Sequence, residues 1–245
     1  MSEKVSAESI ILKRWDYAEK DQIVSFVTAD RGRLQGIAKG AKASRHRFAG
    51  SLDLFCHSRV IFREKKNSGL VVLEEAKLIE GFPRIRSDYN AILLASGLLE
   101  MSYRFYHEGD RACPSFGILL KALRYLEGRE AKREIFWRTL LNNLDAIGLA
   151  PQFFRCVRCD PEASSILLGF DPIGGGMICN RCTGGDSPWM KVPDSLLHWL
   201  KCDGEQGAEL CLEETDETVL GKILRHHVKM QMDLDLEWNR FLQFS

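Results

Sequence analysis

The sequence contains no apolar run long enough for a signal peptide or a membrane helix. Its longest apolar segment, residues 91–101, is interrupted by Ser96, Gly97 and Glu100, whereas a membrane helix needs about 20 mainly apolar residues. We therefore expect a soluble, cytoplasmic protein. Because that compartment is reducing, the eight cysteines are expected to be metal ligands, redox groups or small buried side chains rather than disulfides.

Sequence motifs of the common catalytic sites are also absent. The chain has no HExxH, no GxxxxGK[ST] phosphate loop, no GxGxxG after a strand and no HxE followed by PCxxC. Its six histidines form no catalytic pattern, and at most one of His226 and His227 can face inward from the helix expected there. We therefore expect that the protein is not an enzyme.

The chain has no net charge, with 34 Lys and Arg against 34 Asp and Glu, but the two signs are separated. Residues 31–66 contain ten basic and two acidic side chains, whereas residues 183–245 contain six and twelve. A basic block in a neutral protein indicates a local surface for a polyanion, with a solvated loop as the alternative. The candidate phosphate contacts in this block are Arg31, Arg33, Lys39, Lys42, Arg45 and Arg47.

The first 80 residues are expected to form β-strands, because five runs rich in β-branched and aromatic residues recur between turn signals. A five-stranded OB-fold barrel over residues 1–80 is favoured, with an SH3-like barrel as the alternative. Segment 39–50 is expected to be a mobile basic loop. Trp15, Tyr17 and Phe48 are candidate base-stacking residues, although Trp15 and Tyr17 could equally pack the barrel. The five runs cover residues 9–14, 22–28, 33–38, 51–63 and 70–79.

After Gly81-Phe82-Pro83 the apolar period changes from two to 3.6 residues, which predicts an all-α domain over residues 84–245 and an α+β chain. Ser87 or Asp88 can cap its first helix. Phe136 and Trp137 fall on an apolar helix face, so we interpret them as core residues. The expected helices run from 87 or 88 to about 107, from 114 to 128, through 136–147, over 195–201, and from 216 to about 244 as one or two helices.

Two cysteine pairs give the strongest signal in the chain. Cys156 and Cys159, and then Cys179 and Cys182, each flank two residues, and nineteen residues separate the pairs. Such spacing is typical of a tetrahedral four-sulfur metal site. We therefore predict one structural Zn²⁺ ion in a module over about residues 153–185, inserted in the helical domain. The three glycines at 174–176 predict a hairpin turn that brings 177–178 against 166–170.

Alternatives to this zinc site are a redox dithiol and an iron site. A thioredoxin-type dithiol needs a single pair in a βαβ context, which the sequence lacks, whereas spacing alone does not exclude iron. Four protein ligands would leave no position for a substrate, so the site is expected to be structural. Arg155, Arg158 and Arg181 beside the ligands give this module a possible DNA contact of its own. The other cysteines are expected to be small buried side chains: Cys56, Cys113, Cys202 and Cys211.

Together these features resemble the bacterial RecO family of DNA repair and recombination mediators. The resemblance covers nearly the whole chain and includes a KGAK-type basic loop at 39–42. Its most specific part surrounds the cysteines, although Asp160 stands where many members have glycine. The four cysteines are incomplete in some members, so zinc is not indispensable to the family's activity. The matching positions are Leu144, Gly148, Leu149, Ala150, Pro151, Phe154, Cys156, Cys159, Phe170, Gly174, Gly175, Gly176, Ile178, Cys179 and Cys182.

The resemblance implies a non-enzymatic, nucleoid-associated protein that binds single- and double-stranded DNA and anneals complementary strands. It also implies action with RecR to load RecA on DNA coated by single-stranded DNA-binding protein (SSB). The acidic tail of SSB would bind a basic-rimmed pocket of the helical domain, for which the candidates are Lys121, Arg124, Arg133 and Arg138. The competing hypothesis is a zinc-stabilised adaptor that binds only proteins; an enzyme with an unrecognised site ranks last.

Overall fold

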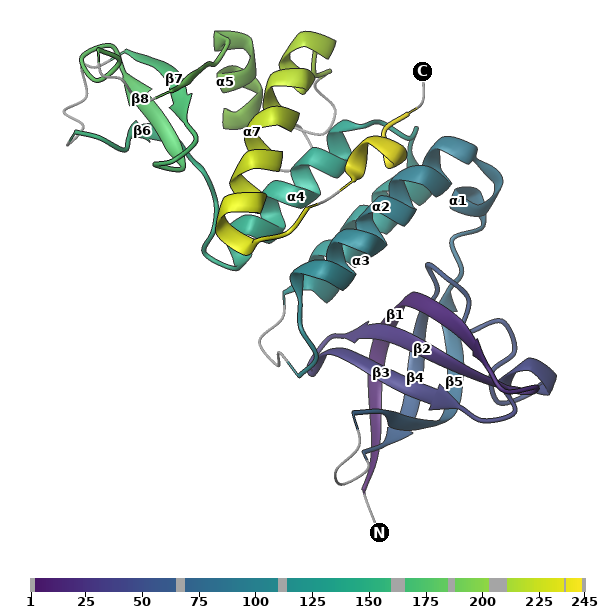
Figure 1. Cartoon of the computed structure of the whole chain (residues 1–245). Helices are drawn as coiled ribbons and strands as arrows, with labels where there is room; N and C mark the ends of the chain where they lie inside the picture. The colour runs from purple at the N-terminus through teal and green to yellow at the C-terminus, as the bar shows by residue number, and fades with distance from the viewer. Residues whose placement is uncertain are drawn as a thin grey trace. The chain divides into compact units, whose positions relative to one another are not determined.

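The computed structural model (Figure 1) describes residues 3–64, 69–109, 114–159, 166–184, 188–202, 211–235 and 237–243. Lys65, Lys66, Cys113 and Asp160 lie outside these ranges. The chain forms two compact units, Met1–Thr139 together with Trp238–Ser245, and Leu140–Glu237. No helix among the described residues is long and apolar enough to cross a membrane. The domain division expected at residues 80–84 stays a prediction.

A closed five-stranded barrel begins the first unit. Its strands are β1 (Lys4–Tyr17), β2 (Asp21–Thr28), β3 (Gly32–Ala38), β4 (His57–Arg63) and β5 (Val71–Glu80). The order β1-β2-β3-β5-β4 closes because β1 also pairs with β4, and β3 runs parallel to β5 while the other neighbours are antiparallel. This is an OB-like arrangement, and with the helices that follow it confirms the predicted fold class.

The predicted strand over residues 51–63 begins only at His57. Before that residue the backbone turns, since the N–H of Cys56 donates to the carbonyl of Asp53 at 3.2 Å. Phe55 has a φ of 69°, a left-handed conformation that interrupts a regular strand. Leu52, Phe55 and Cys56 are nevertheless buried, so this turn has the apolar composition of a strand without its geometry.

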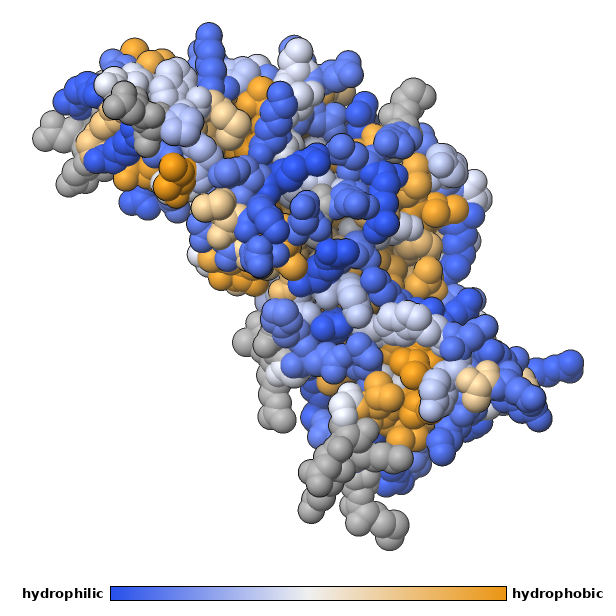
Figure 2. All heavy atoms as spheres, viewed as in Figure 1, coloured by the Kyte–Doolittle hydropathy of each residue, from blue (hydrophilic) through white to orange (hydrophobic). Residues whose placement is uncertain are grey.

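The barrel encloses its own apolar core. Phe26 and Phe62 are fully buried with their rings edge-on at 6.2 Å, and burying such a side chain contributes about 1.5–3 kcal/mol. Gly36 permits this packing, because a Cβ there would lie 3.0 Å from Val71 and 3.1 Å from Leu73. The face drawn in Figure 2 is mainly hydrophilic, with smaller apolar areas on the barrel and on the sheet of the second unit.

Helices complete the first unit: α1 (Pro83–Ser87), α2 (Tyr89–Phe105), α3 (Ser115–Gly128) and the start of α4 (Glu134–Ala146). The carboxylate of Asp88 accepts the backbone N–H groups of Asn90 and Ala91 at 2.9 and 3.1 Å, so the predicted cap is confirmed. In the 3₁₀ helix η2 (Trp238–Phe241), the buried Trp238 ring lies 6.0 Å from that of Phe136 and 5.7 Å from that of Trp137. Phe136 and Trp137 are therefore core residues, as predicted.

The second unit contains a four-stranded sheet in the order β6-β8-β7-β9. Its elements are β6 (Gln152–Cys156), β7 (Leu167–Asp171), β8 (Gly176–Cys179), β9 (Met190–Lys191), α5 (Asp194–Lys201) and α7 (Glu214–Met232). Phe170 pairs with Met177 across the hairpin, and Gly175 has a φ of 69°, so the predicted glycine turn is confirmed.

On α7, one histidine faces inward and the other outward, as expected. His227 is buried, and its Nε2 lies 2.8 Å from the carbonyl of Leu149. Burial lowers the pKa of His227, so this ring is neutral at physiological pH. His226 is exposed. His227 therefore packs in the interior of the second unit, and His226 is solvated.

Candidate metal centre and nucleic-acid interface

The four predicted metal ligands converge on one point. The sulfur atoms of Cys156, Cys159, Cys179 and Cys182 all lie within 4.8 Å of one another, and those of Cys159 and Cys179 are 3.6 Å apart. Four sulfurs around a Zn²⁺ ion, with bonds of about 2.3 Å, define a tetrahedron with edges of about 3.8 Å. The cluster is therefore positioned to bind a metal ion, and four protein ligands leave no coordination site for a substrate.

Strand ends place these ligands. Cys156 is the last residue of β6 and Cys179 the last of β8, and each is followed by a tight turn that returns the second cysteine of its pair. In the second turn the N–H of Cys182 donates to the carbonyl of Cys179 at 2.9 Å. Cys156 and Cys179 are buried whereas their partners are half-buried. The sheet thus fixes one ligand of each pair and the turn supplies the other.

The four thiols differ in proton affinity. Burial raises the pKa of Cys156, but the N–H groups of Arg158, Cys179 and Cys159 donate to its sulfur and together lower that pKa to about 6. Hydrogen bonds to the sulfurs of Cys156, Cys182 and Cys179 raise the pKa of Cys159 to about 12. The pKa of Cys182 is also raised, whereas that of Cys179 is lowered. The metal-free site therefore holds both thiolate and protonated thiols at neutral pH.

We predict that affinity for Zn²⁺ rises at least about 100-fold from pH 7 to pH 8. Metal ions bind thiolates, so the protons on Cys159 and Cys182 must leave, and each displaced proton gives about a tenfold gain per pH unit. Cys156 has already lost its proton in this range and adds little. Competition with a chromogenic chelator at the two pH values measures the change; equal affinities would refute the assignment of protons.

The remaining cysteines have mixed environments. Cys56 is buried and donates its S–H to the carbonyl of Gly50 at 3.4 Å, and burial raises its pKa. It is the small buried side chain that was expected. Cys202 is half-buried, and Cys211 is exposed, so for Cys211 that expectation was wrong. Neither adds a ligand to the four-sulfur cluster described above.

The basic segment between β3 and β4 is held against the barrel. The N–H of Gly40 donates to the carboxylate of Asp21 at 2.8 Å, and the carbonyl of Arg47 accepts the N–H of Ala76 at 2.8 Å. The guanidinium of Arg47 donates to the carbonyl of Lys39 at 2.8 Å. Residues Ala41–Ala43 form a 3₁₀ turn, η1. The prediction of a mobile loop did not include these hydrogen bonds, which fix the backbone that carries the segment's basic side chains.

Four of the six predicted phosphate contacts lie in this anchored segment, and all four are exposed: Lys39, Lys42, Arg45 and Arg47. Lys42 is partly engaged, with its Nζ 3.3 Å from the carboxylate of Asp16. Phe48 does not join them, because its side chain is 3% exposed and belongs to the barrel core. As a stacking residue, Phe48 was therefore a wrong choice.

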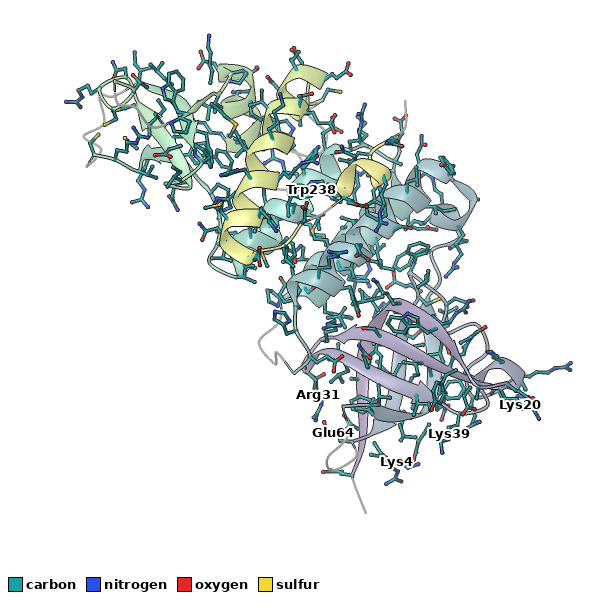
Figure 3. All side chains as sticks on the ribbon, in the orientation of Figure 1. Lys4, Lys20, Arg31, Lys39, Glu64 and Trp238 are labelled. Atoms are coloured by element: carbon teal, nitrogen blue, oxygen red, sulfur yellow. The ribbon has the colours of Figure 1, made fainter. Side chains whose placement is uncertain are left out.

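Arg31 and Arg33 lie elsewhere. Arg31 precedes β3, and Arg33 is its second residue, whereas Lys39 follows its last residue. Because a strand of seven residues is about 20 Å long, these two arginines lie about that far from Lys39. Arg31 pairs with Glu64 at 3.2 Å (Figure 3). Arg33 is buried, donates to the carbonyl of Tyr106 at 2.7 Å and lies over the ring of Tyr103 at 4.5 Å. The structure contradicts a phosphate-binding role for Arg33, which fastens α2 to the barrel.

Lys20 is a basic residue that the sequence pattern missed. It lies in the turn between β1 and β2, and its carbonyl accepts the N–H of Lys42 at 3.1 Å, so this turn borders the basic segment (Figure 3). Pairing of β2 with β3, which sets Gln22 opposite Ala38, brings the two turns together. A lysine outside the basic block gave no signal until that pairing was known.

Trp15 and Tyr17 are exposed by 40% and 51%. They alternate along the end of β1 and so share a face of the strand. Trp15 meets the edge of the Tyr103 ring at 6.4 Å, and Tyr103 also carries the ammonium of Lys13 at 4.0 Å from its ring centre. Of the two roles left open by the sequence, these exposures favour contact with a ligand over barrel packing.

The four residues suggested for partner binding lie on α3 and at the start of α4. Lys121 and Arg124 are exposed on α3, and Arg124 is paired with Glu80 of β5. Arg133 and Arg138, just before and within α4, are half-buried. The role of the set in partner binding remains a prediction. Glu80 also lies 3.0 Å from the buried His57, which makes Arg124 part of an internal network.

Sequence relatives match most of the chain. Models of the family regions described as Recombination protein O N terminal and Recombination protein O C terminal match residues 1–82 and 86–236. The chain is 30% identical over 240 residues to the DNA repair protein RecO of Anaeromyxobacter sp. (strain Fw109-5), which covers 93% of each chain. It is 30% identical over 227 residues to that of Roseiflexus sp. (strain RS-1), covering 89% of this chain and 79% of the relative.

A further relative is the DNA repair protein RecO of Desulfosudis oleivorans (strain DSM 6200 / JCM 39069 / Hxd3), 33% identical over 185 residues that cover 73% of this chain and 71% of that protein. The two family regions meet between the barrel and α2, and the second includes all four cysteines of the metal centre. On these matches, the chain belongs to the RecO family of DNA repair proteins.

Proposed function

We propose that this protein is a recombination mediator, not an enzyme, that binds single- and double-stranded DNA and anneals complementary strands. It acts with RecR to load RecA on SSB-coated DNA, in the cytoplasm and at the nucleoid. Membership of the RecO family supports the role in DNA repair. The binding surface, the partners and the annealing step are the parts that the following observations support and that experiment must test.

The observation that carries the proposal is the anchored basic segment on a closed barrel. Lys39, Lys42, Arg45 and Arg47 are exposed, and Lys20 borders them. Cations that contact phosphates release condensed counterions, which gives binding that is strong, sensitive to salt and largely independent of sequence. Annealing requires such independence, because a mediator must hold any pair of complementary strands.

Exposed aromatic rings beside cations support a preference for single strands. Trp15 and Tyr17 offer apolar faces at the end of β1, and unpaired bases stack on such rings for about 1–3 kcal/mol each. Paired bases are not available for this contact. We therefore propose that phosphate contacts from the basic segment serve both kinds of DNA, and that Trp15 and Tyr17 add affinity for single strands.

We further propose that the metal is Zn²⁺ and that its role is structural. A tetrahedral set of four cysteines binds zinc or iron, and Zn²⁺, which has no redox chemistry, suits a purely structural role. When bound, the ion supplies cross-linking between the two cysteine turns and no catalytic chemistry. The chain's own contribution is to hold the four sulfurs within 4.8 Å of one another and to shield Cys156 and Cys179 from solvent.

For the protein partners, the proposal is less specific. RecR and the acidic tail of SSB require basic or apolar contact surfaces, and Lys121 on α3 is an exposed cation with no acidic partner among the described residues. Arg124, Arg133 and Arg138 complete the proposed set. Because the pairing with Glu80 occupies Arg124, Lys121 is the first residue to change in a binding study.

A strand-annealing assay with and without SSB tests the proposed function. We expect the purified protein to accelerate pairing of complementary strands, bare or SSB-coated, without nucleotide hydrolysis. If the protein instead forms a stable complex with RecR or SSB but leaves the annealing rate unchanged, the adaptor hypothesis replaces the mediator. Turnover of a small-molecule substrate would favour an enzyme.

A further inference from the structure

One arginine connects three segments around the metal centre. Arg158 lies between the ligands of the first cysteine pair, and its Nε and Nη2 atoms both lie 2.8 Å from the Oδ2 atom of Asp171. Its Nη1 atom donates to the carbonyl of Cys182 at 3.1 Å. Arg158 thus spans from the first cysteine turn to the end of β7 and to the last ligand of the second turn.

Asp171 is itself fixed by the glycine hairpin. Its side chain is 7% exposed, and its Oδ1 atom accepts the backbone N–H groups of Ile173 and Gly174 at 3.0 and 3.1 Å. Those bonds and the Arg158 guanidinium, acting against the cost of burial, keep the pKa of Asp171 below its usual range. The carboxylate is therefore a charged anchor that faces both the hairpin and the first cysteine turn.

Close packing leaves the same region little freedom. A Cβ at Gly176 would lie 2.4 Å from a methyl carbon of Val157, and one at Gly174 would lie 2.9 Å from the other methyl. Val157, between Cys156 and Arg158, also donates its N–H to the carbonyl of Met177 at 2.9 Å. The first cysteine turn is thus packed directly on the hairpin, and Arg158 extends that contact to the second turn.

We propose that Arg158 is a positioning residue for the metal centre: by gripping Asp171 and the Cys182 carbonyl together, it holds the two cysteine turns in register for the ion. Two donors of one planar guanidinium make these hydrogen bonds, Nε to Asp171 and Nη1 to the Cys182 carbonyl, in fixed directions that the single ammonium of lysine cannot reproduce. Contacts that orient metal ligands from outside the coordination sphere typically change affinity by about 10- to 100-fold when removed. Arg158 is therefore not available as a DNA contact.

The test is metal affinity of the full-length protein, measured with Zn²⁺ by chelator competition and with Co²⁺ by absorption. For Arg158→Met we expect affinity to fall about 10- to 100-fold, while the Co²⁺ spectrum at saturation keeps the bands of a tetrahedral four-thiolate site. Arg158→Lys should fall between this variant and the wild type. Arg155→Met is the matched control, because Arg155 is exposed beside Cys156 and has one weak hydrogen bond within the described part of the chain, 3.5 Å to Gln152.

A double variant separates positioning from simple loss of a charge partner. Arg158→Met leaves the Asp171 carboxylate buried and unpaired, which by itself destabilises the module. In Arg158→Met/Asp171→Asn that charge is gone, yet the link to Cys182 is still missing, so we expect affinity to stay low. The proposal is overturned if the double variant returns to within twofold of the wild type. It is also overturned if Arg155→Met loses as much affinity as Arg158→Met. A Co²⁺ spectrum of saturated Arg158→Met that shows fewer than four thiolate ligands would overturn it as well.

Discussion

Cys156→Ser is expected to release the metal and to unfold the module formed by β6, β7 and β8, while the barrel remains folded. Cys156 is 6% exposed and is the last residue of β6, so it is the ligand of the first pair that the sheet holds. Structural Zn²⁺ in small modules binds with about 10–16 kcal/mol, and that free energy stabilises the folded state. Loss of one ligand should therefore cost several kcal/mol of module stability. Metal content and hydrogen exchange, resolved along the chain, measure both effects.

The matched control for that experiment is Cys211→Ser. Cys211 is exposed and lies outside the four-sulfur cluster, so its loss should leave metal content and exchange rates unchanged. If Cys156→Ser retained a full equivalent of metal and wild-type protection in β6 and β8, the metal centre would not support the second unit. If protection in β1–β5 fell as well, folding of the barrel would depend on the metal, which contradicts the expected independence of the two units.

The second large effect is expected from the basic segment. Replacing Lys39, Lys42, Arg45 and Arg47 together by alanine should weaken binding of single-stranded DNA at low salt by at least about 100-fold. The slope of log affinity against log salt should become shallower by about three, since each phosphate contact on a single strand contributes about 0.7. Fluorescence anisotropy with a labelled oligonucleotide, titrated at several salt concentrations, gives both numbers.

Two controls make this result specific. Exposed lysines outside the barrel can be replaced in equal number, so that the total charge changes equally; these are Lys191, Lys201, Lys222 and Lys229. Because the Arg47 guanidinium also anchors the segment through the Lys39 carbonyl, the triple variant that keeps Arg47 separates lost cations from a displaced loop. An unchanged slope in the quadruple variant would remove this segment from DNA binding.

Local sequence patterns predicted most elements of this fold because each depended on near neighbours. The five strands follow from the period of their apolar side chains. The helix after Asp88 follows from a cap whose carboxylate binds N–H groups only two and three residues further along the chain. The segment before His57 was mistaken for a strand for the same reason: its apolar residues are buried, but by a turn with Phe55 in a left-handed conformation. The pattern of apolar residues in a sequence therefore predicts which side chains are buried more reliably than it predicts the backbone conformation.

The functional surfaces were only partly predictable, because they depend on contacts distant in sequence. The four cysteines were found by their spacing alone and converge as expected. Arg33 was misassigned because its partner, the carbonyl of Tyr106, lies 73 residues away. Lys20 was missed because only strand pairing brings its turn beside Lys42. A basic residue that serves folding and one that meets DNA have the same appearance in a sequence.

The annealing rate of complementary strands is the measurement that tests the central claim most directly. The wild type and the lysine control variant should pair SSB-coated strands faster than the strands pair alone, and the quadruple variant of the basic segment should lose most of that acceleration. If the quadruple variant anneals strands as fast as the wild type, the anchored basic segment of the barrel is not the surface through which this protein handles DNA.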